Sequence, residues 1–340
     1  MKMFFKRLIK TVIFILVFST AAFLLLSLML HNYVESPVDF RERTMTVEIP
    51  TGVTFATVAD ILQEADLIRH RRAFYAYALI RKAASRIRAG EYELASSMSP
   101  AEILDALVEG RVKGYRVSIP EGFTMGRIAD RLAEKEIVDR DRFMAVATDP
   151  DFLTAQGIEG GSAEGYLFPD TYIFSRAVDE ERVIRFMLDQ LRRRLTGNMI
   201  LRMDQLDMTL GEVLTLASII EKEGGPSEEK PLISAVFHNR LERGMKLQSD
   251  PTIIYGIDDF DGNLKRKDLK RETPYNTYVI RGLPPGPICS PGLDAIMAAL
   301  YPAEVNYLYF VSKNDGTHHF SSNLIDHNKA VVKYQIRRRK

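Results

Sequence analysis

An uncharged, mostly apolar run from Thr11 to Leu30 separates a short N-terminal tail from the rest of the chain. In a helix its 20 residues span about 30 Å, the thickness of the hydrocarbon core of a bilayer. Four basic residues lie within the first ten positions, which predicts a cytoplasmic N-terminus. A cleaved signal peptide has a shorter apolar region and a small-x-small site, which residues 27–31 lack. The run therefore predicts an uncleaved transmembrane helix, with the chain after about residue 31 outside the inner membrane.

Composition sets limits on the part outside the membrane. Hydrophobic residues make up 46% of the 340, enough for a packed core and for two or three domains. The formal net charge of +1 argues against a general nucleic-acid partner, which needs a strong basic excess. The one cysteine, Cys289, excludes an intrachain disulfide. No metal or cofactor is expected, because the H-E-x-x-H spacing of a zinc site is missing around His238, His318, His319 and His327.

An internal repeat marks the first folded region. Val47–Thr54 (VEIPTGVT) recurs seventy residues on as Val117–Thr124 (VSIPEGFT). Each copy predicts a short β-branched strand, a Pro-x-Gly turn, a threonine helix N-cap and an apolar-periodic helix. After the first copy, a second helix is predicted over 71–84 and a strand over 90–94. Strand, two helices and strand resemble the LysM module, which binds glycans through N-acetylglucosamine, although an α+β unit without a ligand fits the pattern equally well.

The segment from Leu210 to Gly225 (LGEVLTLASIIEKEGG) predicts a buried helix that carries two acids near its end. Glu221 and Glu223 fall on opposite edges of its apolar face. Desolvation and the negative end of the helix dipole both raise the pKa of a carboxyl there, which is how a proton donor is kept protonated near neutral pH. Both acids also fit the role of salt-bridged boundary residues. Glu223 lies directly before Gly224-Gly225-Pro226, where the chain opens and a polymer can approach.

Polar residues after this helix give further candidates. Gln248 and Asp250 alternate with Leu247 and Ser249, so both side chains would face the same way from an extended segment, although an Asp-Pro turn is the plainer interpretation. Regions 273–278 and 282–288 are too rich in proline and glycine for helix or central strand. Residues 307–311 predict a buried strand that pairs with 317–321 through an Asn-Asp-Gly hairpin, before a final helix.

Motifs along essentially the whole chain resemble the endolytic murein transglycosylase (YceG-like) family. They are Glu164–Tyr172 (EGYLFPDTY), Ala217–Glu223 (ASIIEKE), Val236–Leu241 (VFHNRL), Leu247–Thr252 (LQSDPT), Tyr275–Tyr278 (YNTY) and Gly282–Ile288 (GLPPGPI). The resemblance implies an enzyme that cuts the β-1,4 bond between N-acetylmuramic acid and N-acetylglucosamine inside nascent peptidoglycan strands. Such an enzyme uses no water, leaves a 1,6-anhydro-muramic end and ends strand elongation.

The resemblance also implies roles for single residues. The catalytic glutamate of the family falls on the second acid of the Glu-x-Glu motif, Glu223. In other lytic transglycosylases a serine follows that glutamate, whereas Gly224 stands here, which removes a possible orienting hydroxyl. The weaker candidates for substrate contact are Glu221, Gln248, Asp250, Tyr275, Asn276 and Tyr278. Partners in the elongation or division machinery, among them peptidoglycan synthases, are implied by the resemblance alone.

The predicted class is therefore α+β, behind a single transmembrane helix, with the enzyme part in the periplasm. The predicted order is a cytoplasmic tail (1–10), the transmembrane helix (11–30), a linker (31–43), a LysM-like module (44–115) and a catalytic domain (116–340), itself a repeat-derived part (116–205) and a core (206–340).

Three alternatives remain at this point. One is a retaining or inverting glycoside hydrolase, with Glu223 as the acid and Asp250 or Glu221 as the second carboxylate. The second is a membrane-anchored, wall-binding scaffold without activity. The third is a chaperone-like partner of wall synthesis enzymes, a role that is compatible with activity.

Overall fold

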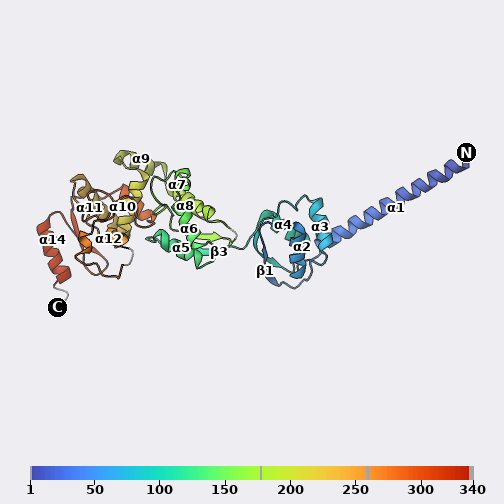
Figure 1. The fold of residues 1–340 in the computed structure, drawn as a ribbon, viewed down its shortest axis with the longest axis horizontal. Helices are drawn as coiled ribbons and strands as arrows, with labels where there is room; N and C mark the ends of the chain where they lie inside the picture. The colour runs from blue at the N-terminus through green and yellow to red at the C-terminus, as the bar shows by residue number, and fades with distance from the viewer. Residues whose placement is uncertain (1, 177, 258–259, 337–340) are drawn as a thin grey trace. The chain divides into compact units, whose positions relative to one another are not determined.

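The computed structural model describes residues 2–176, 178–257 and 260–336. Contacts divide the chain into two compact units, one running to Tyr115 and the other starting at Arg116 (Figure 1), with a short return to the first unit at Ser175. Helices and strands occur in both units, which confirms the predicted α+β class. Met1 of the predicted tail and residues 337–340 of the predicted core lie outside the described residues.

The N-terminal helix α1 (Lys2–Glu35) runs past the end predicted at Leu30. Its residues from Phe4 onward are long and apolar enough to cross a membrane, and none of the apolar window is buried against the rest of the chain. Near its C-terminal end the Tyr33 hydroxyl donates a hydrogen bond to the carbonyl of His70 at 3.0 Å, and Val34 is buried. The helix thus leads directly into the first unit.

The first unit has the order strand, helix, helix, strand, helix. Its elements are β1 (Thr44–Ile49), α2 (Phe55–Glu64), α3 (Arg71–Ile80), β2 (Gly90–Ala95) and α4 (Pro100–Glu109). The two strands pair antiparallel, with Val47 opposite Tyr92. Leu62, Phe74 and Tyr92 are fully buried between the strands and the helices. Helix α3 ends before the predicted Ala84, because Lys82 takes a positive φ of 50° that an α-helix cannot continue through.

The second unit begins with the second copy of the repeat. Its first elements are β3 (Tyr115–Ser118), α5 (Met125–Ala133), α6 (Arg140–Ala147), α7 (Pro150–Ala155), β4 (Thr171–Phe174), α8 (Glu180–Arg194) and α9 (Gly197–Leu206). Thr124 accepts a hydrogen bond from the N–H of Arg127, as Thr54 accepts one from the N–H of Thr57 in the first copy. The predicted N-caps are therefore confirmed in both copies. Strands β3 and β4 form a two-stranded sheet.

Helix α10 (Leu210–Glu223) is the buried centre of the second unit. Every residue from Val213 to Ile220 is buried, and the helix packs against α11 and α13. The elements that follow it are η1 (Ser227–Glu229), α11 (Lys230–Glu242), α12 (Asp250–Tyr255), η2 (Asp268–Lys270), α13 (Leu293–Leu300), β5 (Tyr309–Ser312), β6 (His318–Ser321), α14 (Leu324–Val331) and a π-helical turn η3 (Val332–Ile336). The predicted hairpin is present, but β5 is half-buried where a buried strand was expected. Phe310 packs on Phe237 of α11 and Tyr309 on His327 of α14, and neither face is fully covered.

Candidate active site

Glu223 is the last residue of α10, and the chain leaves it through two glycines with positive φ, Gly224 at 76° and Gly225 at 91°. The residue as a whole is half-buried, but its carboxyl lies among packed atoms and accepts a hydrogen bond of 2.5 Å from the Ser249 hydroxyl. Desolvation raises the pKa of Glu223 to about 7, against the lowering effects of the Ser249 hydrogen bond and the Arg240 charge. At neutral pH this carboxyl can both donate and accept a proton.

Glu221, the other acid of the helix, has different surroundings. Its carboxylate lies 3.0 Å from the Nζ atom of Lys230 and accepts the N–H of Gly292 at 3.2 Å. The Lys230 side chain is only 7% exposed and that of Glu221 11%. Glu121 approaches the same ammonium at 3.9 Å. Glu221 thus belongs to a buried ion pair that joins α10 to α11, whereas Glu223 has a neutral hydroxyl as its hydrogen-bond partner.

Ser249 is held by its own set of hydrogen bonds. Its N–H donates to the Thr277 hydroxyl at 3.0 Å, and its carbonyl accepts from the Thr252 hydroxyl at 2.7 Å. The residue is 1% exposed. The hydroxyl that is missing at Gly224 in the sequence is therefore supplied from the segment before α12. Sequence reasoning missed this role and used Ser249 only as a residue that alternates with Gln248 and Asp250.

Replacing Ser249 by alanine is expected to raise the pKa of Glu223 further. The serine hydroxyl donates to the charged form of the carboxyl, and a hydrogen bond to a charged group contributes about 1.5–3 kcal/mol, so its loss should move the titration up by about one pH unit or more. A carbon-13 NMR titration of the glutamate carboxyls measures the change. Ser234→Ala is the matched control, because the buried Ser234 hydroxyl has no hydrogen-bond partner among the described residues. An unchanged Glu223 titration in a folded Ser249→Ala variant would contradict the assignment.

Asp250 and Tyr278, two of the predicted contact residues, lie together beside Glu223. The Tyr278 hydroxyl donates to the Asp250 carboxylate at 2.7 Å. The negative charge of Asp250 helps to raise the pKa of Glu223, and burial, with smaller effects of Asp250 and Glu223, raises the pKa of Tyr278. Asp250 begins helix α12, so the predicted extended segment ends one residue earlier than expected. Gln248 is exposed, as is Asp250, while Ser249 is buried between them.

Tyr275 and Asn276 occupy other positions. Asn276 is fully buried, and its side-chain amide donates to the carbonyl of Arg271 at 2.7 Å and to that of Asp268 at 3.2 Å. It holds the preceding loop and does not face solvent. The Tyr275 ring lies 4.8 Å from that of Tyr255, centroid to centroid.

Tyr275 lines a pocket of about 330 Å³, and so does a second buried acid, Glu164. Besides these two residues it is lined by Tyr166, by parts of the loops 157–162 and 284–287, and by the N-terminal turns of α10. The Glu164 carboxylate accepts the N–H of Met125 on both oxygens, at 3.0 and 3.1 Å, and the hydroxyl of Tyr255 at 3.3 Å. Burial raises the pKa of Glu164 to about 7. Sequence reasoning treated this residue only as part of a motif and missed its burial.

The two near-neutral acids differ in access. Glu164 is 4% exposed, and both of its oxygens are occupied by donors. Glu223 is half-buried, and the Ser249 hydroxyl is the hydrogen-bond partner found for its carboxyl among the described residues. Glu223 is not among the residues that line the pocket around Glu164. Glu223 thus keeps one carboxylate oxygen without a hydrogen-bond partner among the described residues, next to an exposed turn, which makes it the better candidate for a proton donor.

Arg240 completes the surroundings of Glu223. The side chain is buried, and its guanidinium donates to the carbonyls of Leu308 and Leu247, both at 2.7 Å. Its positive charge lowers the pKa of Glu223 against the effect of burial. Within the described part of the chain, no group of three or more His, Cys, Asp or Glu is placed to hold a metal ion.

Comparison with known proteins connects this site to a family. The model of the YceG-like family matches residues 47–333. The endolytic murein transglycosylase of Bacillus subtilis (strain 168) is 32% identical over 307 residues, covering 86% of this chain and 85% of that protein. The protein of the same name from Streptococcus pneumoniae (strain R6) is 31% identical over 334 residues, and the match spans 60% of its longer chain.

A solved structure agrees with these matches. The crystal structure of a protein from Listeria monocytogenes, described as putative and YceG-like, is 32% identical and superposes with a TM-score of 0.59. The superposition covers 85% of this chain and 100% of that one. A family model that spans most of the sequence, relatives above 30% identity and a matching structure lead to one conclusion: the chain belongs to the YceG-like family.

Proposed function

We propose that this protein is an endolytic peptidoglycan lytic transglycosylase that cuts the bond between N-acetylmuramic acid and N-acetylglucosamine within a glycan strand and leaves a 1,6-anhydro-muramic end. The observation that carries the proposal is the Glu223 carboxyl, with a pKa of about 7 and a hydroxyl partner, directly before a turn that is exposed to solvent. The names of the Bacillus and Streptococcus relatives support the same reaction.

One carboxyl is sufficient for both proton transfers. Protonated Glu223 donates its proton to the glycosidic oxygen, the bond to C1 of the muramic residue breaks, and an oxocarbenium-like centre forms. The Glu223 carboxylate then takes the proton of the muramic C6 hydroxyl as that oxygen bonds to C1. The closure is intramolecular, so no water enters the product. The Ser249 hydroxyl stabilises the carboxylate between the two transfers, and the charge of Asp250 favours its reprotonation.

A glycoside hydrolase needs a second carboxylate that is free to act on water or on the sugar. Glu221 is paired with Lys230, and the Asp250 carboxylate accepts the Tyr278 hydroxyl. Glu221 is thus held by a cation, which leaves the exposed Asp250 as the candidate second acid of a hydrolase, and the mass of the products decides between the two reactions. We assign Asp250 and Tyr278, with the exposed Gln248 and the partly buried Tyr275, to contacts with the sugar chain.

The mass of the products tests the reaction. Purified peptidoglycan digested by the full chain should give muropeptides that end in anhydro-muramic acid, each lighter by one water than the product of a hydrolase. Products with reducing muramic ends would show a hydrolase. Tight binding to the glycan without any product would show a scaffold.

The first unit and α1 are assigned accessory roles. We infer that α1 anchors the protein in the inner membrane with the second unit in the periplasm, and that the strand–helix–helix–strand order of the first unit serves as a LysM-like glycan-binding module. Peptidoglycan synthases of the elongation or division machinery are the proposed protein partners. Binding of N-acetylglucosamine oligomers to full-length Glu223→Gln tests the module, and complete lack of binding would reject it.

A further inference from the structure

The turn that follows Glu223 lies directly on a buried side-chain pair. A Cβ atom built on Gly225 would lie 3.2 Å from both the Nδ1 and Cε1 atoms of His318 and 3.3 Å from the Oε2 atom of Glu229. Gly225 also has a φ of 91°, which residues with a side chain rarely adopt. The glycine therefore brings the backbone into contact with the imidazole and the carboxylate, two residues after the proposed acid.

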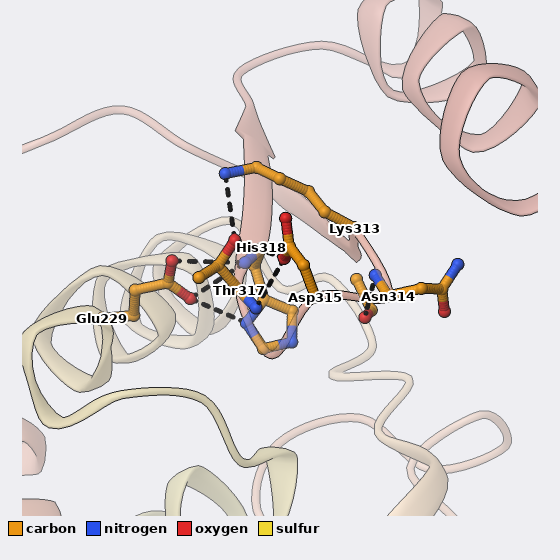
Figure 2. Close-up of polar contacts among 7 residues, drawn as sticks. Glu229, Lys313, Asn314, Asp315, Thr317 and His318 are labelled. Carbon is orange, nitrogen blue, oxygen red and sulfur yellow. Dashed lines mark hydrogen bonds and ion pairs between the residues drawn. The ribbon is translucent and has the colours of Figure 1, made fainter.

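Glu229 and His318 hold each other by three hydrogen bonds, as Figure 2 shows. The Nδ1 atom of His318 lies 2.8 Å from Oε2 of Glu229, and the backbone N–H of His318 donates to both carboxylate oxygens, at 3.0 and 3.2 Å. Because the carboxylate acts as the acceptor, Nδ1 carries the hydrogen. The His318 side chain is 9% exposed and that of Glu229 is 15% exposed, so the pair is shielded from water and from salt.

The pair joins the start of one helix to a hairpin from the end of the chain. Glu229 ends η1, directly before α11, while His318 begins β6. The imidazole also packs edge-to-face on Phe310 of β5, with ring centroids 5.5 Å apart, and Phe310 in turn packs on Phe237 of α11 at 5.9 Å. The hairpin is therefore anchored to α11 at two points.

The tip of the hairpin is ordered independently of this pair. Asp315 accepts the backbone N–H of Thr317 at 3.0 Å and its hydroxyl at 2.8 Å, and the Lys313 ammonium donates to the Thr317 hydroxyl at 3.2 Å (Figure 2). The Lys313 backbone N–H donates to the Thr317 carbonyl at 2.8 Å. These contacts stay within the hairpin. A change at Asp315 thus alters the tip without touching the contact between Glu229 and His318.

We propose that Glu229 and His318 are positioning residues for Glu223: together they fix the Gly224–Gly225 turn and so keep the Glu223 carboxyl on the Ser249 hydroxyl. Neither residue is assigned a contact with the sugar. This inference rests on the proposed function, because it concerns the same acid. Errors of about 1 Å in the placement of a reacting group can cost about 100-fold in rate, which gives a rigid support of this kind a large effect.

Two substitutions of His318 separate its hydrogen bond from its bulk. His318→Leu fills similar space without a donor, whereas the amide nitrogen of His318→Asn can take the place of Nδ1. With full-length protein and purified peptidoglycan, we expect His318→Leu to lower kcat by about 10- to 100-fold while KM changes less than about two-fold. His318→Asn should retain most of the wild-type kcat. Asp315→Ala is the control in the same hairpin and should leave kcat unchanged.

The pH dependence of activity separates a positioning role from simple unfolding. Loss of folded protein lowers the rate at every pH, but it does not shift the pH at which activity falls. A loosened turn admits water to the Glu223 carboxyl, which reduces the desolvation that raises its pKa. The acid then loses its proton at lower pH, so the upper limb of the kcat/KM profile of His318→Leu should move to lower pH. Calorimetry identifies any variant that has simply unfolded.

The outcomes distinguish this inference from the proposed function. If folded His318→Leu keeps the wild-type kcat and pH limb while wild type still makes anhydro products, the positioning role is wrong and the function stands. If folded His318→Asn is as impaired as His318→Leu, the hydrogen bond is not the cause and the inference is overturned. If wild type itself makes no anhydro product, the proposed function fails first.

Discussion

Replacing Glu223 by glutamine should reduce the release of anhydro-muropeptides by at least about 1000-fold. A general acid alone contributes about 10²- to 10⁴-fold, and here the same carboxyl is proposed to return as the base. The glutamine amide has nearly the same shape but can neither give up a proton nor take one at neutral pH. Digestion of purified peptidoglycan, with products separated and weighed, measures the loss directly.

Another glutamate of the same helix provides the matched control. Glu212 lies at the N-terminal end of α10, where its side chain accepts the N–H of Thr209 at 2.8 Å in a capping box. Glu212→Gln keeps an acceptor there and should retain nearly full activity. If folded Glu223→Gln kept more than about a tenth of the wild-type rate, another group would have to supply the proton, and Glu164 would be tested next by the same substitution.

Stability should change in the opposite direction to activity. The pKa of Glu223 is about 7 in the folded chain, above the ordinary value of 4.5. The folded state therefore holds this proton more tightly, and wild type loses stability as pH rises from about 4.5 through 7. Glutamine cannot ionise, so it does not share this loss. The unfolding free energy of Glu223→Gln minus that of wild type should therefore be larger at pH 8 than at pH 5. Urea midpoints at the two pH values measure this gain, and they also show that the inactive variant is folded.

The sequence predicted what depends on local pattern. Helix α10 and its stop follow from the apolar period and from Gly224-Gly225, because capping, periodicity and glycine turns act within a few residues. The same holds for the threonine N-caps of the two repeat copies, Thr54 at the start of α2 and Thr124 at the start of α5. The two acids of α10 were recognised as candidates, but their different surroundings were not.

What separates the acids comes from residues distant in sequence. Ser249 reaches Glu223 from 26 positions away, and Gly292 reaches Glu221 from 71. No periodic pattern encodes such pairings, since they depend on how helices pack. Burial of Glu164 likewise depends on the N–H of Met125, 39 residues earlier. Asn276 is the opposite case. It was a candidate for substrate contact, but its amide donates to a carbonyl only five residues away and so stabilises its own loop.

Lys230→Met should destabilise the second unit by about 3–5 kcal/mol at pH 7, the usual cost of leaving one charge of a buried ion pair unpaired. Among the residues that the structure describes, the N–H of Gly292 would be the donor left to the Glu221 carboxylate, with Glu121 still nearby. Chemical denaturation of the full chain, followed by circular dichroism, measures the loss of unfolding free energy.

A second substitution shows whether the unpaired charge is the cause. In Lys230→Met with Glu221→Gln, both charges are gone, so most of the lost stability should return. Lys329→Met is the surface control, because Lys329 and its partner Asp326 are 73% and 53% exposed, and such a solvent-screened pair contributes little to stability. A loss for Lys230→Met no larger than for Lys329→Met would mean that Glu221 does not depend on Lys230. Glu221 lies two residues before Glu223 on the same helix. Loss of its ion pair should therefore lower activity in step with unfolding, without the shift of the pH limb expected when the turn after Glu223 is loosened.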